Sequence, residues 1–560
     1  MFIVLLSWVY IAAVSWILGR SFHLFWEKKS GISFATPEGI LLSGLACSAV
    51  YAQLFSLFYG IGALANGILL GICIILIIFI YVKFHSLKAL FLIPQQNHKP
   101  SFKRVVCSII VCTVILLYIS ILTAQTPIHY DTYLYHAQAI HWIEEYGCVT
   151  GLGNLHNRFA YNSSFLVLQA LYSFHDLTGT SLHTLNGFIA AMFLCWCLVS
   201  LKFFREKKLF ISDGLRLALI YYLLHNSTYL SSPNTDTFAL SLVLYLFIKW
   251  GEFLEQKESH YEPYAWLCLL GVFGCTLKLS SAFVLVFLIK PISMIFQKEK
   301  HPWKKFGSCS LMALALALPY FLRSIRISGY LLYPYSGLDL FPFLDWKMDP
   351  GVLDYDRMEI VAWGRGTYDM TTLDWSVTQW FPIWFSQQTS VGKREIVAAF
   401  VAVIGLLVTS ILLIKKKDWD LLLYSLTSLV CLFGWFFSAP LIRYGEVYLL
   451  LVSVIFVFYW LQKVRGFHRT KMGFLLLSLL LVVLRVSMMQ IAYYPQGLTL
   501  SYQDYSSYPC IETDWEGNTI YVAEIDTQTG YDPFPTVFSE ETLDELTLRG
   551  DSLKNGFAPK

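Results

Sequence analysis

Fourteen apolar stretches constrain the fold of this chain more than any other feature of its sequence. They cover residues 1–18, 40–58, 62–82, 105–123, 183–201, 212–230, 236–251, 263–276, 279–292, 306–322, 395–414, 419–438, 446–462 and 472–491. A helix of about 20 apolar residues crosses the hydrocarbon core of a bilayer. Charged residues make up 14% of the chain, whereas soluble proteins carry about 25%. The sequence therefore predicts an all-α polytopic membrane protein with about 14 spanning helices.

Two neighbouring stretches, 263–276 and 279–292, are separated by only two residues. Lys257 precedes the pair, and a cluster of lysines from Lys290 to Lys305 follows it. Short segments rich in Lys and Arg lie on the cytoplasmic side of a membrane, so both ends of the pair are expected on that side. The chain must then reverse between the two stretches, which predicts a helical hairpin with Lys278 at its tip.

The distribution of lysine and arginine predicts the orientation. Basic residues cluster at 20–29, 83–104, 202–208, 415–417 and 463–471. The segments 124–182, 231–235 and 439–445 contain only Arg158 and Arg443 as basic residues. Because Lys and Arg accumulate in cytoplasmic loops, the clusters are predicted to face the cytoplasm, and both termini to face outward. The net charge of +3 gives no indication of a nucleic-acid partner.

Three outward segments are long. In the first, 124–182, the pattern of 133–146 is helical and predicts a helix along the membrane surface. The second, 323–394, is rich in Tyr, Trp, Asp and Pro. The third is the acidic tail 495–560, in which Asn518 to Ile525 has the composition of a strand.

The part of the first outer segment from Thr126 to Ser164 concentrates ionisable and amide side chains. Loops this polar at a membrane face are more often working sites than connectors. Asp131 follows the end of an apolar helix, where desolvation is expected to raise the pKa of its carboxyl towards that of a general base. Candidate substrate-binding residues in the same segment are His136, His156, Arg158 and Asn162. In the alternative interpretation, Asp131 has no catalytic role and only anchors the end of the helix at the membrane interface, in contact with water.

Asp236 ends the short outward turn Ser231–Asp236. It either caps the following helix, a role that Asn234 and Thr235 can also fill, or faces the same pocket as Asp131. Two carboxylates are hard oxygen ligands of the kind that Mg²⁺ or Mn²⁺ prefers. We keep such a metal on Asp131 and Asp236 as a possibility and expect no other cofactor.

Cationic side chains recur at the predicted outer face. Lys278 interrupts an apolar run, Arg323 and Arg326 end a helix, and Arg443 precedes Tyr444. Each alone is commonly an interfacial anchor. Together they predict a binding site for a phosphate group. The sequence has no Walker loop and no HExxH motif.

With these residues in place, the chain resembles the GT-C superfamily of membrane glycosyltransferases, which use polyprenyl-linked sugars. The resemblance covers the architecture of residues 105–322 and the string YDTYLYHAQAIHWIEEYG…GLGNLHNRFAYNSS, which looks like an uncharacterised bacterial branch. It implies a catalytic role for Asp131, and it aligns Asp236 with a loop that carries metal-binding acids in oligosaccharyltransferases. This chain has Asn234-Thr-Asp236 there and Tyr130 before Asp131, so two acids of the family pattern are missing.

The resemblance also divides the chain. Residues 1–104 are expected to be added N-terminal helices, 105–494 a GT-C-like catalytic core and 495–560 a periplasmic tail. The expected activity is inverting transfer of a sugar from a polyprenyl-(pyro)phosphate to a glycan, lipid or protein acceptor at the outer face of a bacterial inner membrane. Two alternatives stay open: transfer of a whole lipid-linked glycan, and a flippase or transporter without chemistry.

Overall fold

The computed structural model describes residues 1–91, 93, 101–202, 209–463, 488, 497–525 and 527–560. Ten helices in this part of the chain are long and apolar enough to cross a membrane. They are α1 (Phe2–Ser30), α2 (Pro37–Ser56), α3 (Ala63–Phe84), α5 (Phe102–Thr123), α13 (Thr235–Gln256), Leu279–Lys298, α16 (Pro302–Ser328), α19 (Ser390–Lys416), α20 (Trp419–Ser438) and α21 (Ile442–Leu461). The chain is thus a helical, multi-pass membrane protein.

The predicted count of 14 spans is not confirmed. Three of the predicted stretches form shorter helices, α10 (Leu185–Ser200), α12 (Ile211–His225) and α14 (Tyr261–Leu277). The predicted span 472–491 lies outside the described residues, apart from residue 488.

The predicted hairpin at Lys278 is present. Helix α14 ends at Leu277, and the chain returns as a 3-10 segment, η4 (Leu279–Leu288), followed by α15 (Ile289–Lys298). The 3-10 segment packs back along α14, so Lys278 lies at the turn.

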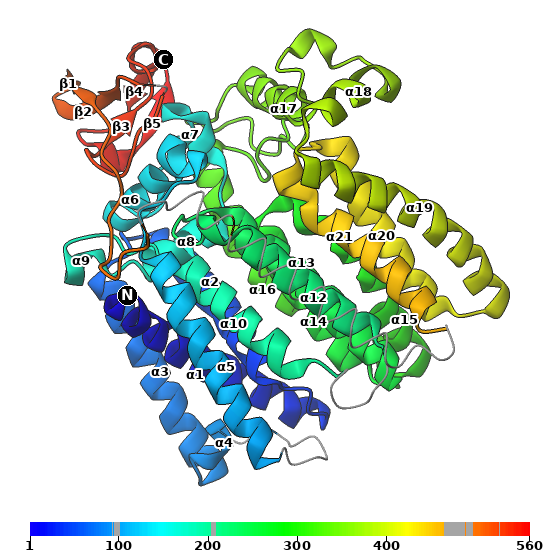
Figure 1. The fold of residues 1–560 in the computed structure, drawn as a ribbon. Helices are drawn as coiled ribbons and strands as arrows, with labels where there is room; N and C mark the ends of the chain where they lie inside the picture. The colour runs from blue at the N-terminus through cyan, green and yellow to red at the C-terminus, as the bar shows by residue number, and fades with distance from the viewer. Residues whose placement is uncertain (92, 94–100, 203–208, 464–487, 489–496, 526) are drawn as a thin grey trace.

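Short helices form the outer segments at the top of Figure 1. The first segment contains the π-helix η1 (Thr132–His136), α6 (Ala137–Glu145), α7 (Leu152–Leu155), η2 (Asn157–Ala160), α8 (Ser164–Leu171) and α9 (His175–Thr178). The second contains α17 (Pro350–Gly364), η5 (Met370–Thr372) and α18 (Val377–Gln387). The helical prediction for 133–146 therefore agrees with η1 and α6. Two further short elements are α4 (Lys88–Phe91) and η3 (Ser227–Tyr229).

The tail is a small β structure beside α6 and α7 (Figure 1). It contains β1 (Cys510–Trp515), β2 (Asn518–Ala523), β3 (Thr536–Val537), α23 (Glu541–Asp544), β4 (Leu546–Leu548), η6 (Leu553–Asn555) and β5 (Phe557–Pro559). Strand β2 pairs antiparallel with β1 and parallel with β3, and β4 pairs antiparallel with β5. The predicted strand from Asn518 is β2.

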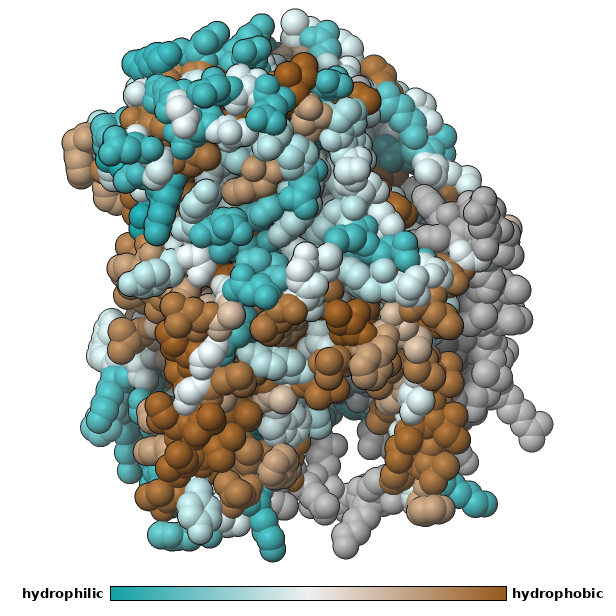
Figure 2. Space-filling view, turned by 90° about the vertical axis from the view of Figure 1, so that its left-hand side faces the viewer, coloured by the Kyte–Doolittle hydropathy of each residue, from teal (hydrophilic) through white to brown (hydrophobic). Residues whose placement is uncertain are grey.

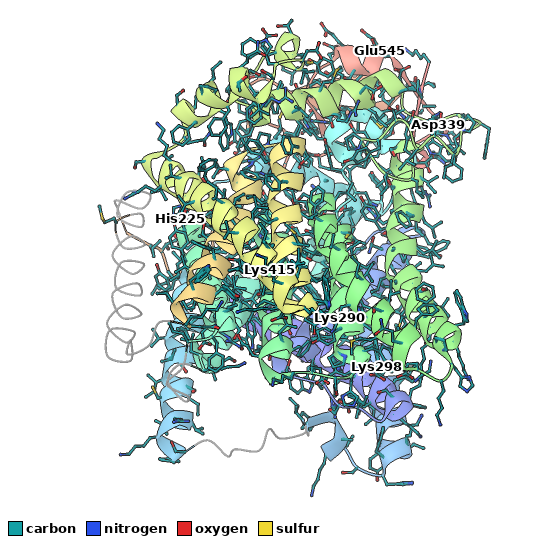
Figure 3. The ribbon with its side chains drawn as sticks, turned by 90° about the vertical axis from the view of Figure 1, so that its right-hand side faces the viewer. His225, Lys290, Lys298, Asp339, Lys415 and Glu545 are labelled. Atoms are coloured by element: carbon teal, nitrogen blue, oxygen red, sulfur yellow. The ribbon has the colours of Figure 1, made fainter. Side chains whose placement is uncertain are left out.

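The surface has a hydrophilic part and a hydrophobic part, as expected for a protein that spans a bilayer. Figure 2 shows hydrophilic residues over the upper part of one face and hydrophobic residues gathered below them. Asp339 of the second outer segment and Glu545 of the tail lie near the upper end, whereas Lys290 and Lys298 lie towards the lower end (Figure 3). These two lysines thus lie towards the end that the sequence predicts to be cytoplasmic.

The N-terminal helices pack directly on the rest of the bundle. Helix α2 contacts α1 along its length, and it also contacts α8, α14 and α16. Gly19 of α1 and Gly44 of α2 leave no room for a Cβ, because backbone atoms of the partner helix lie against them. This close pairing fixes α1 and α2 as one unit against α14 and α16.

Candidate functional site

Asp131 is held at the junction between a loop and a π-helix. Helix α5 ends at Thr123, and Asp131 occupies the N-cap position of η1. Its backbone N–H donates to Nδ1 of His129 at 3.2 Å. Single π-helical turns occur often at functional sites. The Asp131 side chain is 15% exposed and therefore still reachable.

Arg443 binds this carboxylate. Its Nη2 donates to Oδ2 of Asp131 at 2.7 Å and to the Tyr444 hydroxyl at 2.9 Å. Arg443 Nη1 lies 3.4 Å from Nε2 of His129. Arg443 sits in the first turn of α21, directly after the tight turn from α20. That turn places Arg443 beside Asp131 of the first outer segment, although the two residues are far apart in the sequence.

A second ion pair lies beside the first. Asn234 caps α13 by accepting from the Thr237 N–H at 2.9 Å, so Asp236 is not needed for that cap. Lys278, at the hairpin turn, donates to Oδ1 of Asp236. The Lys278 Nζ also lies 3.7 Å from the centroid of the Tyr444 ring, and Arg443 Cζ lies 4.9 Å from the same centroid. Tyr444 therefore lies against both cations.

These groups border a cavity of about 500 Å³. Most of its wall is apolar, with contributions from the first outer segment, the hairpin turn, α17 and the turn between α20 and α21. Predicted site residues that line it are Asp131, His136, Arg158, Asn162, Lys278, Arg443 and Tyr444. Asp236 does not line the cavity; it contacts Lys278, which does. Such a cavity suits an amphipathic ligand whose charged group meets Lys278 and Arg443.

His136 offers two uncommitted polar atoms at this wall. Its side chain is buried, and neither ring nitrogen has a hydrogen-bond partner in the part of the chain that the structure describes. The ring lies next to those of Tyr135 and His129. Burial lowers the pKa of His136 to about 3, so the imidazole is neutral at pH 7. A neutral imidazole can donate one hydrogen bond to a ligand and accept another.

Arg158 and Asn162 line the cavity but have partners within the protein. Arg158 pairs with Asp356 at 2.7 Å and with Glu359 at 2.5 Å. Asn162 donates to the Tyr320 carbonyl at 2.7 Å. Sequence reasoning missed Asp356 and Glu359, which lie three residues apart on α17, because it predicted no helix in the second outer segment.

Three predicted substrate-binding residues do not line the cavity. Arg323 is buried and donates to Asn162 Oδ1 at 3.1 Å and to Ser56. Arg326 donates to Thr150 and to the Leu57 carbonyl. His156 is buried, and its Nδ1 accepts from the Arg158 N–H. Arg323 ties α16 to the end of α2, Arg326 ties it to the loop that follows, and both also bind the first outer segment, so their charges serve the fold at these contacts.

The pKa of Asp131 is lower than its usual value, whereas the sequence analysis expected it to be higher. Burial does raise it, but Arg443, followed by His129 and His136, outweighs burial and lowers the pKa of the carboxyl. Asp131 is therefore a carboxylate at neutral pH and a weaker base than expected, because a cation that sequence order does not reveal is hydrogen-bonded to it.

The donor set does not fit a resident divalent metal. Among the described residues, no group of three or more His, Cys, Asp and Glu side chains is arranged to hold one. Asp131 and Asp236 are each bound to a cationic side chain. A Mg²⁺ or Mn²⁺ ion on these two carboxylates would have to displace Arg443 and Lys278.

Comparison with protein families gives one match, to the model described as Domain of unknown function (DUF8201), over residues 1–450. The chain belongs to this family. The DUF8201 match runs across residue 104 and contains every described residue that lines the cavity. No curated protein and no solved structure matches the chain. The family description assigns no function, so function must be argued from the chemistry of the cavity.

Proposed function

We propose that the chain is an integral-membrane glycosyltransferase. It moves a sugar from a polyprenyl-(pyro)phosphate donor to an acceptor hydroxyl at the outer face of a bacterial inner membrane. The observation that carries this proposal is the meeting of Asp131 with Arg443 and Lys278 in a largely apolar cavity. A carboxylate, two cations and apolar walls correspond to the needs of a general base, a phosphate and a lipid chain.

Donor binding uses the cations. Lys278 and Arg443 both line the cavity, and each already interacts with a carboxylate that a phosphate can replace. Charge-assisted hydrogen bonds to phosphate oxygens are stronger than neutral ones. The apolar walls contributed by Leu277, Leu279 and Phe437 suit the first isoprene units of the donor.

Donor binding also prepares the base. Arg443 contributes most to lowering the pKa of Asp131 against burial. When a phosphate oxygen takes over hydrogen bonds of Arg443, that contribution weakens and burial raises the pKa of the carboxyl. Asp131 then becomes a better proton acceptor only in the loaded cavity, which limits the reaction to the complex with donor.

In the chemical step, Asp131 accepts the proton of the acceptor hydroxyl. The acceptor oxygen forms a bond to the anomeric carbon while the bond from that carbon to the phosphate oxygen breaks. The electron pair stays on the departing phosphate, whose growing charge Lys278 and Arg443 stabilise. One displacement inverts the anomeric configuration. His136 can hold a hydroxyl of the sugar with its free ring nitrogens.

The test replaces Asp131 with Asn, which keeps the shape and removes the proton acceptor. Transfer from a polyprenyl-phosphate sugar is expected to fall by about 10²–10⁴, the usual contribution of general base catalysis. Asp354→Asn is the matched control, because Asp354 does not line the cavity. Both variants must insert and show normal thermal unfolding. Near-normal transfer by Asp131→Asn removes Asp131 from the mechanism.

The same assay separates the two other candidates. A single mass increment on the acceptor equal to a whole glycan block identifies an oligosaccharyltransferase, for which α17 provides part of the cavity wall. Translocation of the lipid-linked sugar without any glycosylated product identifies a carrier.

A further inference from the structure

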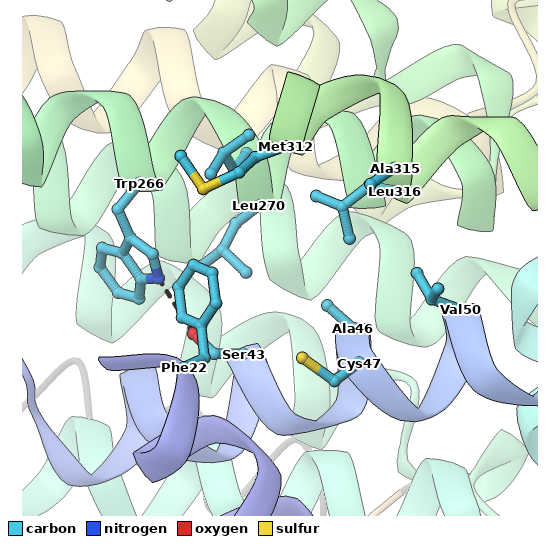
Figure 4. Close-up of a pocket in the computed structure, with 11 residues that line it drawn as sticks. Phe22, Ser43, Ala46, Cys47, Val50, Trp266, Leu270, Met312, Ala315 and Leu316 are labelled. Atoms are coloured by element: carbon cyan, nitrogen blue, oxygen red, sulfur yellow. Dashed lines mark hydrogen bonds between the residues drawn. The ribbon is translucent and has the colours of Figure 1, made fainter. Parts of the chain in front are cut away.

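An apolar groove lies between α1 and α2 on one side and α14 and α16 on the other. It has a volume of about 250 Å³. Figure 4 shows Phe22, Ala46 and Cys47 across from Leu270 and Met312. The Asp131 cavity is bordered by the hairpin turn that follows the end of α14, whereas this groove is bordered by residues nearer the start of the same helix. The two sites are therefore separate.

The polar groups that line the base of the groove, Ser43 and the indole N–H of Trp266, are hydrogen-bonded to each other. Trp266 Nε1 donates to the Ser43 hydroxyl at 3.0 Å, the dashed line in Figure 4. His23 Nε2 lies 3.1 Å from the same hydroxyl. Nearly all of the remaining groove surface is carbon and sulfur. An occupant therefore gains by burying hydrocarbon there and not by forming hydrogen bonds.

The groove continues to a cationic end. A second hollow shares Phe22 and Met312 with it and is also lined by Lys29 and Lys305. Lys29 of α1 donates to the Ser308 hydroxyl of α16 at 2.9 Å, across the hollow. Among the described residues, no carboxylate forms an ion pair with either lysine, although Glu262 interacts with Lys305 at longer range. Two cations thus flank the end of an apolar channel.

We propose that this groove binds an anionic glycerophospholipid of the surrounding membrane. An acyl chain lies along Ala46, Leu270 and Leu316, and the phosphate lies between Lys29 and Lys305. Charge complementarity selects this occupant, because lysines near a membrane surface attract anionic lipids. The lipid bridges the α1–α2 pair to α14 and α16. This inference is independent of the proposed transferase activity.

The experiment uses the full chain in nanodiscs of phosphatidylcholine, with or without phosphatidylglycerol. A lipid that binds only the folded state raises the Tm. Phosphatidylglycerol is expected to raise the Tm of the wild type. The double variant Lys29→Gln with Lys305→Gln is expected to bind phosphatidylglycerol roughly tenfold more weakly or worse. The matched control is Lys28→Gln with Lys304→Gln, which removes two charges at the same end without touching either hollow.

The proposal is overturned if the two double variants lose phosphatidylglycerol binding equally. It is also overturned if the wild type has the same Tm in nanodiscs with and without phosphatidylglycerol. Displacement of phosphatidylglycerol by lower concentrations of polyprenyl phosphate also overturns the chosen occupant. If the lysine variant folds poorly, Ala315→Phe fills the groove from the exposed side of α16 and keeps both lysines. It is expected to lose the response to phosphatidylglycerol, and an unchanged response counts against the groove.

Discussion

Arg443 Nη2 donates a 2.7 Å hydrogen bond to Oδ2 of Asp131, joining two residues that are 312 positions apart. This contact connects the first turn of α21 to the start of the first outer segment. It makes Asp131 a carboxylate at neutral pH, and it places the cation proposed to bind phosphate against the candidate base. A ligand that binds Arg443 must compete with Asp131 for its guanidinium group.

Replacing Arg443 with Gln is expected to raise the pKa of Asp131, because the guanidinium is the largest influence lowering it. The ascending limb of the pH dependence of kcat/KM for sugar transfer then moves to higher pH. Arg357→Gln is the control and is expected to leave the pH of this ascending limb unchanged. Arg357 also lines the cavity, but it pairs with Asp354 at 3.4 Å and not with Asp131. Equal shifts in both variants contradict a specific contact between Arg443 and Asp131.

Replacing Asp356 with Asn is expected to destabilise the outer segments. Asp356 is buried and accepts from Arg158, Tyr161, Tyr333 and Asn157. Loss of one partner of a buried ion pair costs about 3–5 kcal/mol. The measurement is thermal unfolding together with hydrogen exchange in α17.

The matched control for that variant is Asp354→Asn. Asp354 is on the same helix, but its pair with Arg357 is largely exposed. Exposed pairs contribute about 0–1 kcal/mol. The role of Asp356 is refuted if the two variants unfold alike.

The stability of the outer segments is expected to fall as the pH drops below about 6.5. Burial lowers the pKa of His136 and His156 to about 3 and that of His141 to about 4. Below pH 6.5 the unfolded chain takes up protons that the folded chain does not bind, so unfolding becomes easier. Each histidine contributes up to about 1.4 kcal/mol per pH unit in this window.

The measurement is Tm between pH 7.5 and 5. His141→Gln is expected to reduce the slope of Tm against pH. His85→Gln serves as control, since the His85 side chain is exposed in the folded chain. No change of slope in either variant argues against burial of the histidines as the cause.

Chelation with EDTA is expected to leave sugar transfer unchanged. Asp131 and Asp236 are both bound to cationic side chains, and the described residues provide no third ligand for a metal. The assay compares the protein treated with EDTA before and after addition of Mg²⁺ or Mn²⁺. Loss of activity that the metal restores would show that the ion pairs open to form a metal site.

Replacing Tyr531 with Phe is expected to loosen the tail. The Tyr531 hydroxyl donates to Oε2 of buried Glu144 at 2.6 Å, and its ring stacks on His141. A buried acceptor that loses its donor costs about 1–3 kcal/mol. Limited proteolysis of residues 497–560 measures the effect. Tyr521→Phe in β2 is the control, and equal cleavage of both variants contradicts a docking role for Tyr531.

Several parts of the architecture could be predicted from local sequence. The turn at Lys278 follows from two apolar stretches with lysines at both outer ends. The strand from Asn518 and the helical state of the segment around Ile140 follow from residue pattern. The prediction failed for the pKa of Asp131, and four residues proposed for the site, His156, Asp236, Arg323 and Arg326, do not line the cavity. The partners of the two arginines, Ser56 and Leu57, come from distant parts of the chain, whereas His156 accepts from the backbone of Arg158, two residues away.

By itself, the sequence determined that the chain is a multi-pass helical membrane protein, and it pointed to the residues that carry charge at one face. Apolar length and the placement of lysines are local properties, and a bilayer acts on them directly. Only the tertiary structure decided that Arg443 binds Asp131, that Lys278 binds Asp236 and that Asp356 holds Arg158. These pairings depend on which helices become neighbours, and many charges of suitable sign are available along the chain. The packing of α17, α21 and the hairpin turn around one cavity selects among them.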